Sequence, residues 1–444
     1  MMVAFVAAGV VVAGLSGRLA PHWVPDSASY LNYPFGSLDS ICRSIRTPGY
    51  PLWLRLWQST LGIAAVPLMQ VIVHGAASGW FATQLRRMGL PTTPAVVAGI
   101  AVAIGCTAMD HISSLSTDAL AASVGVMVVC SLLQWVFVVH QPRWMLLTVA
   151  LATLAIMLRP AYLFLIPWLF VATFLLVCHQ RRGTRAAFSN AAIVSSASLL
   201  PVVAWMLMRF FVVGDFAMLP FGHQNLAGVL VQLVSDQELE RLTGDAGDLG
   251  HEVVQAKTRF IESGGRFADG PPTATMTIDG SWDDMTYSVV IPAAEVLRGD
   301  QSIASHHLVA RMNQQIVGRY PIRYLVWYLK NLRRGAWAIA ADMVMHPLFL
   351  GVIVVGLGWI VYCAVTVPGA GTAIELQARQ GVARLAIVAT TYLFANLGFV
   401  AITSPTIGRF SDAAAIFLPA WIAVVFVQNY FGTACCSAKG MRHE

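Results

Sequence analysis

Long apolar stretches separated by short polar loops make up most of the chain. Ten of these stretches come close to the length of about 17–25 residues that a transmembrane helix needs. They cover approximately residues 2–20, 61–83, 91–109, 118–139, 144–158, 161–178, 190–212, 338–365, 385–402 and 412–430. The fifth is short and ends at Arg159-Pro160, which is typical of a partial span packed inside a bundle. The pattern predicts an all-α integral membrane protein with about ten transmembrane helices.

One long polar segment interrupts this pattern. Residues 213–335 hold 14 of the 22 acidic and 11 of the 28 basic side chains, a net charge of −3, whereas the rest of the chain carries +9. We expect this segment to form an aqueous insert with helices at 225–242, 251–264 and 286–318 and a loop at 265–285. The chain then divides into an N-terminal transmembrane module with an outer loop at 21–60 (1–212), the insert (213–337), and C-terminal transmembrane helices with a short cytoplasmic tail (338–444).

The basic residues of the short loops predict the orientation of the bundle. Lys and Arg are retained on the cytoplasmic side, and here they fall on one side if ten helices alternate: Arg86-Arg87, Arg143, Arg181-Arg182, Arg185, Arg379, Arg384, Lys439 and Arg442. Both termini then lie inside, and the insert faces outward with the loops 21–60, 110–117 and 403–411. The first apolar stretch lacks a basic segment before it, so we interpret it as an uncleaved span.

Two segments have the pattern of helices that lie at the membrane surface. Pro48-Gly49-Tyr50-Pro51 is expected to break any helix, and the following Leu52–Trp57 predicts a short aromatic-rich interfacial helix. On a second helix, from 319 to 335, four cations fall on one face beside an aromatic stripe: Arg319, Arg323, Lys330 and Arg334, with Tyr320, Tyr324, Trp327 and Tyr328. An aromatic belt with cations near lipid headgroups is one interpretation, and binding of a lipid phosphate is another.

Composition narrows the class further. The chain is 57% hydrophobic and only 11% charged, which excludes a soluble globular enzyme. The sequence pI near 9 reflects loop arginines, so we expect no nucleic-acid partner. Six of the seven cysteines lie in apolar stretches or at the C-terminus, and no spacing predicts a zinc site, so we expect neither a disulfide framework nor a metal or other cofactor.

The residues that could carry chemistry gather where the outer loops meet the bundle. Asp26 and Tyr30 lie in the first outer loop, followed by Arg46 and Tyr50. The second outer loop supplies Asp110 and His111, and Asp118 opens the fourth span. Arg159-Pro160 ends the fifth span, and the stretch from Ser404 to Phe410, with Arg409, lies at the outer end of the ninth and tenth. Any one of Asp110, Asp118 or Arg159 alone is well explained as a helix cap or a snorkelling side chain. Asp26, in a loop next to proline, has less structural explanation.

Together, these residues resemble the GT-C superfamily of polytopic glycosyltransferases, which contains protein O-mannosyltransferases and bacterial aminoarabinose-lipid A transferases. The resemblance rests on Asp26 with Tyr30, on Arg46-x-Pro48-x-Tyr50-Pro51, on Ser116-Thr117-Asp118, on Arg159-Pro160 and on Arg409, and covers the first 180 residues best. Ser27 stands where O-mannosyltransferases have a second acid, and the chain has no D-x-D sequence, so we expect no metal-dependent mechanism.

The resemblance implies transfer of a sugar, with inversion, from a polyprenyl-phosphate carrier to an acceptor hydroxyl. The acceptor is a lipid, a polysaccharide or a protein, and the site lies on the periplasmic or extracellular face of a bacterial inner or plasma membrane. Asp26 is then the base. The donor phosphate is expected at Arg46, Arg159, Arg409 and Lys330, while Tyr30, Tyr50, His111 and Asp118 bind the acceptor or orient other groups.

Three other classes of function stay open. A transporter or flippase for an envelope lipid should show paired repeats and charges near mid-depth, whereas the charges here gather at the outer rim. A polysaccharide polymerase or ligase would use a pyrophosphate-linked donor, so the identity of the donor distinguishes it. A structural membrane subunit would carry its outward-facing acids on separate surfaces that do not converge.

Overall fold

The protein is built from helices. The computed structural model describes residues 1–105, 110–270, 275–299, 302–345, 373–406 and 412–428, with the isolated positions 351, 354, 355 and 408. Over these residues it contains no strand, and the only β-type pairing there is one bridge between His22 and Ser114. Five helices are long and apolar enough to cross a membrane: Ile63–Arg87, Asp118–Val138, Pro160–His179, Thr184–Val213 and Arg379–Thr403. These helices indicate a membrane protein.

The helices of the apolar regions follow the predicted stretches closely, with some differences in length. They are α1 (Met2–Leu15), α5 (Val66–Arg87), α6 (Thr92–Ala103), α8 (Asp118–Leu133), α9 (Pro142–Leu158), α10 (Leu165–His179), α11 (Thr184–Val213) and α20 (Ala373–Thr403), and Ala413–Gln428 is also helical. The helix predicted at 2–20 stops at Leu15, because Gly17 takes a positive φ of 70° and turns the chain. Most of the stretch 338–365 lies outside the described residues. The number of ten crossings therefore stays a prediction.

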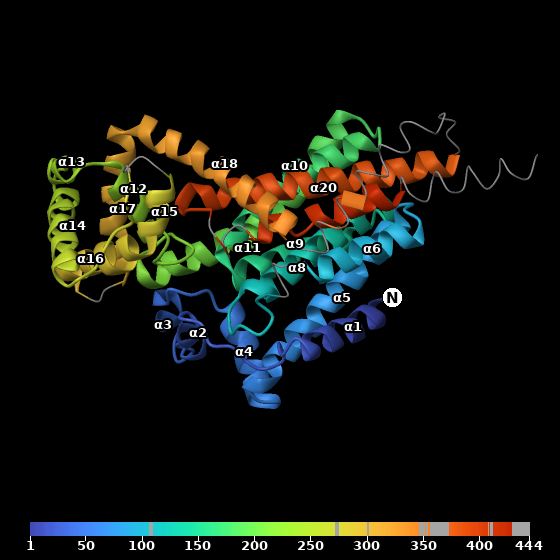
Figure 1. Ribbon diagram of the computed structural model, residues 1–444, viewed down its shortest axis with the longest axis horizontal. Helices are drawn as coiled ribbons and strands as arrows, with labels where there is room; N and C mark the ends of the chain where they lie inside the picture. The colour runs from blue at the N-terminus through green and yellow to red at the C-terminus, as the bar shows by residue number, and fades with distance from the viewer. Residues whose placement is uncertain are drawn as a thin grey trace, which may run out of the picture.

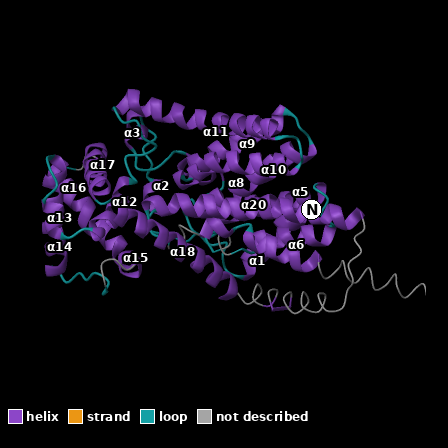
Figure 2. Ribbon diagram, turned by 90° about the horizontal axis from the view of Figure 1, so that it is seen from above, coloured by secondary structure: helices purple, strands orange, loops and turns teal. Residues whose placement is uncertain are grey.

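Small residues allow the N-terminal helices to approach closely. A Cβ added at Gly75 of α5 would lie 2.8 Å from the Val6 backbone, and one at Gly79 would lie 2.7 Å from that of Met2. The two glycines are four residues apart, which is the spacing that lets membrane helices pack backbone to backbone. α5 also contacts α6 and α8, while α10 contacts α11 and α20. Figure 1 shows α8, α9 and α20 along the long axis, and Figure 2 shows α11 along one edge of the bundle.

The first outer loop contains three helices: α2 (Ser27–Leu31), α3 (Leu38–Arg43) and α4 (Gly49–Thr60). The expectation that Pro48 to Pro51 excludes a helix was wrong, because α4 begins at Gly49 and includes Pro51 in its first turn. Proline is tolerated there, where the backbone N–H has no partner within the helix. Leu52 and Leu56 of α4 are exposed, whereas Tyr50 and Leu54 are buried against the bundle.

Gly49 is the point at which α4 meets the end of α9. A Cβ at this position would lie 2.4 Å from the carbonyl oxygen of Met157 and 2.8 Å from the backbone nitrogen of Leu158. We expect Gly49→Ala to push the two helices apart and to cost about 1–3 kcal/mol, the usual range for overpacking. The apparent melting temperature of the purified protein measures this effect. Gly36→Ala in the same loop is the control, because a Cβ there meets nothing within 4 Å; equal melting temperatures for the two variants would contradict the prediction.

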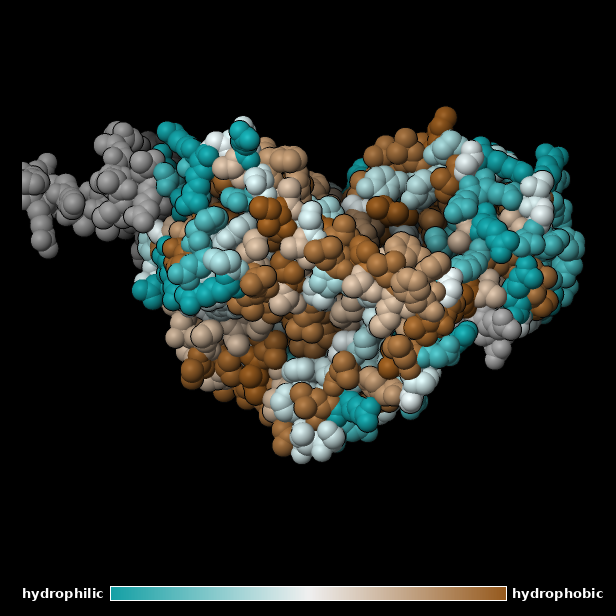
Figure 3. Space-filling model, turned by 180° about the vertical axis from the view of Figure 1, so that it is seen from behind, coloured by the Kyte–Doolittle hydropathy of each residue, from teal (hydrophilic) through white to brown (hydrophobic). Residues whose placement is uncertain are grey.

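The insert has a hydrophobic core of its own. It consists of α12 (His223–Leu233), α13 (Asp236–Glu240), α14 (Asp245–Glu262), α15 (Thr275–Asp284), η4 (Met285–Val290), α16 (Ile291–Arg298) and α17 (Ser302–Arg319). The loop expected at 265–285 was wrong for its second half, because Ile278 and Trp282 of α15 are buried against Val229 and Trp327. Tertiary packing thus outweighs the weak local signal. Figure 3 shows hydrophilic residues over the insert at the right and hydrophobic residues over the middle of the molecule.

The helix expected at 319–335 is divided at its start and presents the opposite face. α17 ends at Arg319 and α18 runs over Pro321–Met345. Its aromatic stripe does not form an outward belt: Trp327 is buried, the Tyr324 hydroxyl donates to the carbonyl of Ile402 at 2.7 Å, and the Tyr328 hydroxyl donates to that of Gly398 at 3.4 Å. The aromatic residues therefore attach α18 to the insert and to α20.

A buried histidine makes the insert sensitive to acid. Burial and the neighbouring His223 ring, 4.6 Å away, lower the pKa of His306 to about 4 from 6.5. The folded protein then binds fewer protons than the unfolded chain between pH 6.5 and 4, so stability falls as the pH drops through this window, by up to about 3 kcal/mol. We expect His306→Gln to lose less of its melting temperature between pH 7 and pH 4.5 than the unchanged protein. His251→Gln, at an exposed histidine of α14, should keep the full loss; an unchanged loss in His306→Gln would refute the assignment.

Candidate functional site

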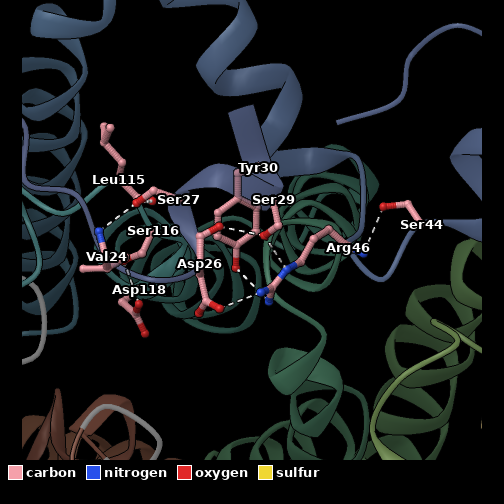
Figure 4. Close-up of polar contacts among 10 residues, drawn as sticks. All are labelled: Val24, Asp26, Ser27, Ser29, Tyr30, Ser44, Arg46, Leu115, Ser116 and Asp118. Carbon is pink, nitrogen blue, oxygen red and sulfur yellow. Dashed lines mark hydrogen bonds and ion pairs between the residues drawn. The ribbon is translucent and has the colours of Figure 1, made fainter. Parts of the chain in front are cut away.

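The first outer loop is fastened to the loop that precedes α8. The backbone nitrogen of His22 donates to the carbonyl of Ser113 at 2.7 Å, and that of Leu115 donates to the carbonyl of His22 at 2.9 Å. The Ser27 hydroxyl accepts from the backbone nitrogen of Val24 at 2.9 Å and donates to the carbonyl of Leu115 at 3.0 Å. These bonds hold Asp26, next to Ser27, beside the start of α8, as Figure 4 shows.

Asp26 and Arg46 form an ion pair at the surface of a cavity. One guanidinium nitrogen of Arg46 lies 2.6 Å from a carboxylate oxygen of Asp26. The same guanidinium donates to the Ser29 hydroxyl at 2.9 Å and to the Tyr30 hydroxyl at 3.3 Å, and it lies 4.8 Å from the centre of the Tyr30 ring. The side chain of Asp26 precedes α2 but makes no capping hydrogen bond to it. The carboxylate is therefore aimed at Arg46 and the cavity and not at the helix.

Asp118 and Arg159 form a second and deeper ion pair. Asp118 is the first residue of α8 and is only 6% exposed; it accepts a hydrogen bond from the Ser116 hydroxyl at 2.8 Å and pairs with Arg159. Arg159 ends α9 in an extended conformation, as expected for a residue before proline. Asp118 is an acid in the first turn of α8, as the sequence suggested. Its carboxylate also pairs with Arg159 at the cavity.

Both ion pairs line one cavity of about 360 Å³. Its charged wall comes from Asp26, Arg46, Asp118 and Arg159, with Tyr30 beside them. An apolar wall is formed by Leu158, Ala161, Leu163, Met218, Leu219, Phe399 and Val400. The insert supplies a third wall, from Phe221, Gly222, Asn225 and Tyr287, and Thr403 and Ser404 of the α20 end also contribute. The volume falls within the range of roughly 300–1,000 Å³ that is usual for small-molecule sites.

The remaining predicted site residues do not line this cavity. Tyr50 is fully buried behind it, where its ring meets that of Tyr30 edge-on at 5.1 Å. His111 lies in the loop before α8, and Lys330 lies on α18 with its side chain exposed. Arg409 lies outside the described residues. Asp110, which the sequence also placed in this group, pairs at the surface with Arg18 at 2.8 Å.

The sequence interpretation missed the contribution of the insert. Phe221, Gly222 and Asn225 directly follow the first transmembrane module, and this position near the outer end of the bundle is the one signal that points to them. Gly222 has a φ of 118°, a backbone conformation that favours glycine, and it precedes α12. Ser29 was also missed, although it accepts a hydrogen bond from Arg46.

A fully buried arginine connects the chain segments that lead to the cavity wall. Arg209 of α11 donates to the carbonyl of Cys42 at 2.9 Å and to that of Ala217 at 2.5 Å, and it pairs with Asp215 at 2.7 Å. The second carboxylate oxygen of Asp215 lies 2.9 Å from His307 of α17. Arg209 thus joins the loop that leads to Arg46, the loop that leads to the insert and, through Asp215, the insert itself. The sequence shows Arg209 only as an arginine inside an apolar stretch, which does not predict these partners.

No metal site is defined by the described part of the chain, where no group of three or more His, Cys, Asp or Glu side chains converges. Both acids of the cavity are paired with arginines, which are not metal ligands. Independence from metal stays a prediction.

Comparison with known proteins assigns no family to the chain. No protein-family model, no curated protein and no solved structure matches it.

Proposed function

We propose that the protein is a membrane glycosyltransferase that moves a sugar from a polyprenyl-phosphate carrier to an acceptor hydroxyl. The observation that carries the proposal is the convergence of Asp26, Arg46, Asp118 and Arg159 on one cavity, although they are distant along the chain. A carboxylate beside fixed guanidinium groups suits a reaction in which a hydroxyl loses a proton while a phosphate leaves. The resemblance to the GT-C superfamily agrees with this chemistry.

The three walls of the cavity suit the three parts of such a reaction. The guanidinium groups of Arg46 and Arg159 match a phosphate, to which arginine donates paired hydrogen bonds. The apolar wall, built by the end of α9, the 3-10 turn Pro160–Phe164, α20 and the segment after α11, suits the first units of a prenyl chain. We assign the acceptor to the wall formed by the insert, which includes Asn225 and Tyr287. In this arrangement the insert selects the acceptor and the bundle holds the donor.

Asp26 is the better of the two candidate bases. Its side chain is 23% exposed, whereas that of Asp118 is 6% exposed and is held by Arg159 and Ser116. In the proposed step the acceptor oxygen attacks the anomeric carbon from the face opposite the phosphate, and its proton passes to Asp26. The bond between the anomeric carbon and the phosphate oxygen breaks, and polyprenyl phosphate leaves with the electron pair. The product has the inverted configuration.

Arg46 sets the order of donor binding and proton transfer in this step. Its guanidinium pairs with Asp26, and a carboxylate in an ion pair is a poor proton acceptor. A donor phosphate competes for the same guanidinium, because both are anions that accept from its N–H groups. Binding of the donor then turns Arg46 from Asp26 toward the phosphate and makes Asp26 available as base. Asp118 keeps Arg159 in place throughout.

The proposal includes the topology that the charges predict. Ten crossings with both termini inside place the cavity and the insert on the outer face of a bacterial inner or plasma membrane, where polyprenyl-linked sugars are consumed. Lys330 does not line the cavity and Arg409 lies outside the described residues, so the proposed donor site rests on Arg46 and Arg159.

Purified protein in liposomes, incubated with a panel of polyprenyl-phosphate sugars, tests the function. We expect release of free polyprenyl phosphate with at least one sugar. Turnover of a pyrophosphate-linked oligosaccharide alone would instead support a polymerase or ligase, and movement of intact carrier between leaflets without cleavage would support a flippase. A protein that neither binds nor cleaves any member of the panel would overturn the proposal.

A further inference from the structure

The outward face of α18 carries a stripe of exposed apolar side chains. Its inward face is closed by Trp327 and Asn331, both buried, and by hydrogen bonds from Tyr324 and Asn331 to the end of α20. On the opposite side Ile322, Leu325, Val326, Leu329 and Trp337 are all exposed, with Ile322 at 74% and Trp337 at 75%. Ile322, Leu325, Val326 and Leu329 recur at spacings of three and four residues, and Trp337 lies eight residues after Leu329, so all five share one stripe of the helix.

This stripe carries positive charge and no negative charge. Arg333 lies four residues from both Leu329 and Trp337, which places it on the stripe itself, and Lys330 lies at its edge. Both cations are exposed, and residues 321–341 contain no acid at all. An exposed apolar stripe with arginine, lysine and tryptophan is the combination found on helices that lie in the headgroup region of a membrane.

The position of α18 in the fold favours a lipid over a protein as the partner. The helix passes from the insert to the bundle, as Figure 1 shows, and it packs on α20, whose segment Arg379–Thr403 is long and apolar enough to cross a membrane. Its last residues, from Ala336 to Met345, are mainly apolar. The stripe thus runs along the helix toward the bundle, beside a helix that is long and apolar enough to cross a membrane.

We propose that the exposed stripe of α18 binds the outer leaflet of the membrane, with Arg333 and Lys330 at the phosphates of anionic phospholipids. The aliphatic side chains from Ile322 to Leu329 then lie among the upper parts of the acyl chains, and Trp337 lies near the headgroups. This contact holds the insert down on the membrane and keeps the cavity at the level of the outer leaflet. It does not depend on the proposed sugar transfer.

Photocrosslinking in liposomes of phosphatidylcholine and phosphatidylglycerol tests this contact. Benzoylphenylalanine replaces Leu325 or Leu329 in the full chain, and mass spectrometry identifies the adducts after illumination. The matched control is Ile261 of α14, which is 57% exposed compared with 53% for Leu325 but lies on the insert away from α18. We expect lipid adducts at positions 325 and 329, and several-fold fewer at 261. Adducts with a second copy of the chain, or equal labelling at 261, would overturn the proposal.

The charges are tested separately in the same liposomes. At position 325 we expect phosphatidylglycerol adducts in excess of its share of the lipid, by about fivefold for each cation. Arg333→Gln with Lys330→Gln should remove this excess but keep the adducts themselves, because the apolar stripe is intact. Arg266→Gln, in the insert, is the charge control. An excess that persists in the double variant would overturn the role of the two cations.

Discussion

Replacing Asp26 with asparagine is expected to reduce sugar transfer by about 10²–10⁴-fold, the usual contribution of a general base. Asparagine keeps the shape of the side chain but cannot accept the proton of the acceptor. The fold should persist, because the asparagine oxygen still accepts from the Arg46 guanidinium and both side chains keep contact with solvent, at 23% and 25% exposure. Release of polyprenyl phosphate measures the rate, and binding of the carrier measures whether the donor site is intact.

The first outer loop contains its own control for this variant. Asp39 pairs with Arg43 at 2.8 Å, as Asp26 does with Arg46, but both side chains of that pair are more than half exposed and neither lines the cavity. Asp39→Asn should therefore transfer sugar at the rate of the unchanged protein. If Asp26→Asn keeps full activity, the base is another group and the proposed mechanism is wrong.

Replacing Arg209 with methionine is expected to destabilise the protein by about 3–5 kcal/mol, because it leaves a buried carboxylate without its cation. The carbonyls of Cys42 and Ala217 also lose their donor. The apparent melting temperature of the purified protein should fall by on the order of 5–10 °C. Activity should fall as well, since both segments that Arg209 holds lead into the cavity wall.

Two further variants distinguish the loss of the buried Arg209–Asp215 ion pair from the loss of an arginine at an exposed position. Arg185→Met, at the exposed opposite end of α11, should change stability by about 0.5 kcal/mol or less. Arg209→Met combined with Asp215→Leu should recover part of the loss, because no unpaired charge is then buried. A melting temperature of Arg209→Met equal to that of Arg185→Met would show that the buried network does not hold these loops.

The positions of the apolar helices were predictable from sequence, and their ends were not. A run of apolar residues is a strong signal, and α5, α8, α10, α11 and α20 lie where such runs occur. Ends depend on local backbone conformation, as at Gly17, where α1 stops five residues early, and at Gly49, where α4 begins inside a Pro-Gly-Tyr-Pro sequence. The periodicity of α18 revealed its aromatic stripe correctly, but periodicity alone cannot distinguish an inward face from an outward one.

The site residues near the ends of the spans were predicted better than the site residues that the tertiary structure brings to the cavity from the insert. Asp26, Arg46, Asp118 and Arg159 were named as ionisable groups near the ends of spans, and Tyr30 through the GT-C resemblance; the structure brings all five to one cavity. Tyr50 was named through the same resemblance, His111 from the second outer loop and Lys330 from the helix expected at 319–335, and none of the three lines the cavity. The wall formed by the insert depends on how the insert folds back on the bundle, which no local pattern encodes.

The central claim is that this cavity binds the phosphate of a polyprenyl carrier between Arg46 and Arg159, with the sugar facing Asp26. The most direct measurement is an experimental structure of the protein in lipid with a bound polyprenyl-phosphate sugar. We expect phosphate oxygens about 2.7–3.2 Å from both guanidinium groups, with Arg46 turned away from Asp26. A carrier bound with its phosphate outside this cavity, while Arg46 remains on Asp26, would contradict it.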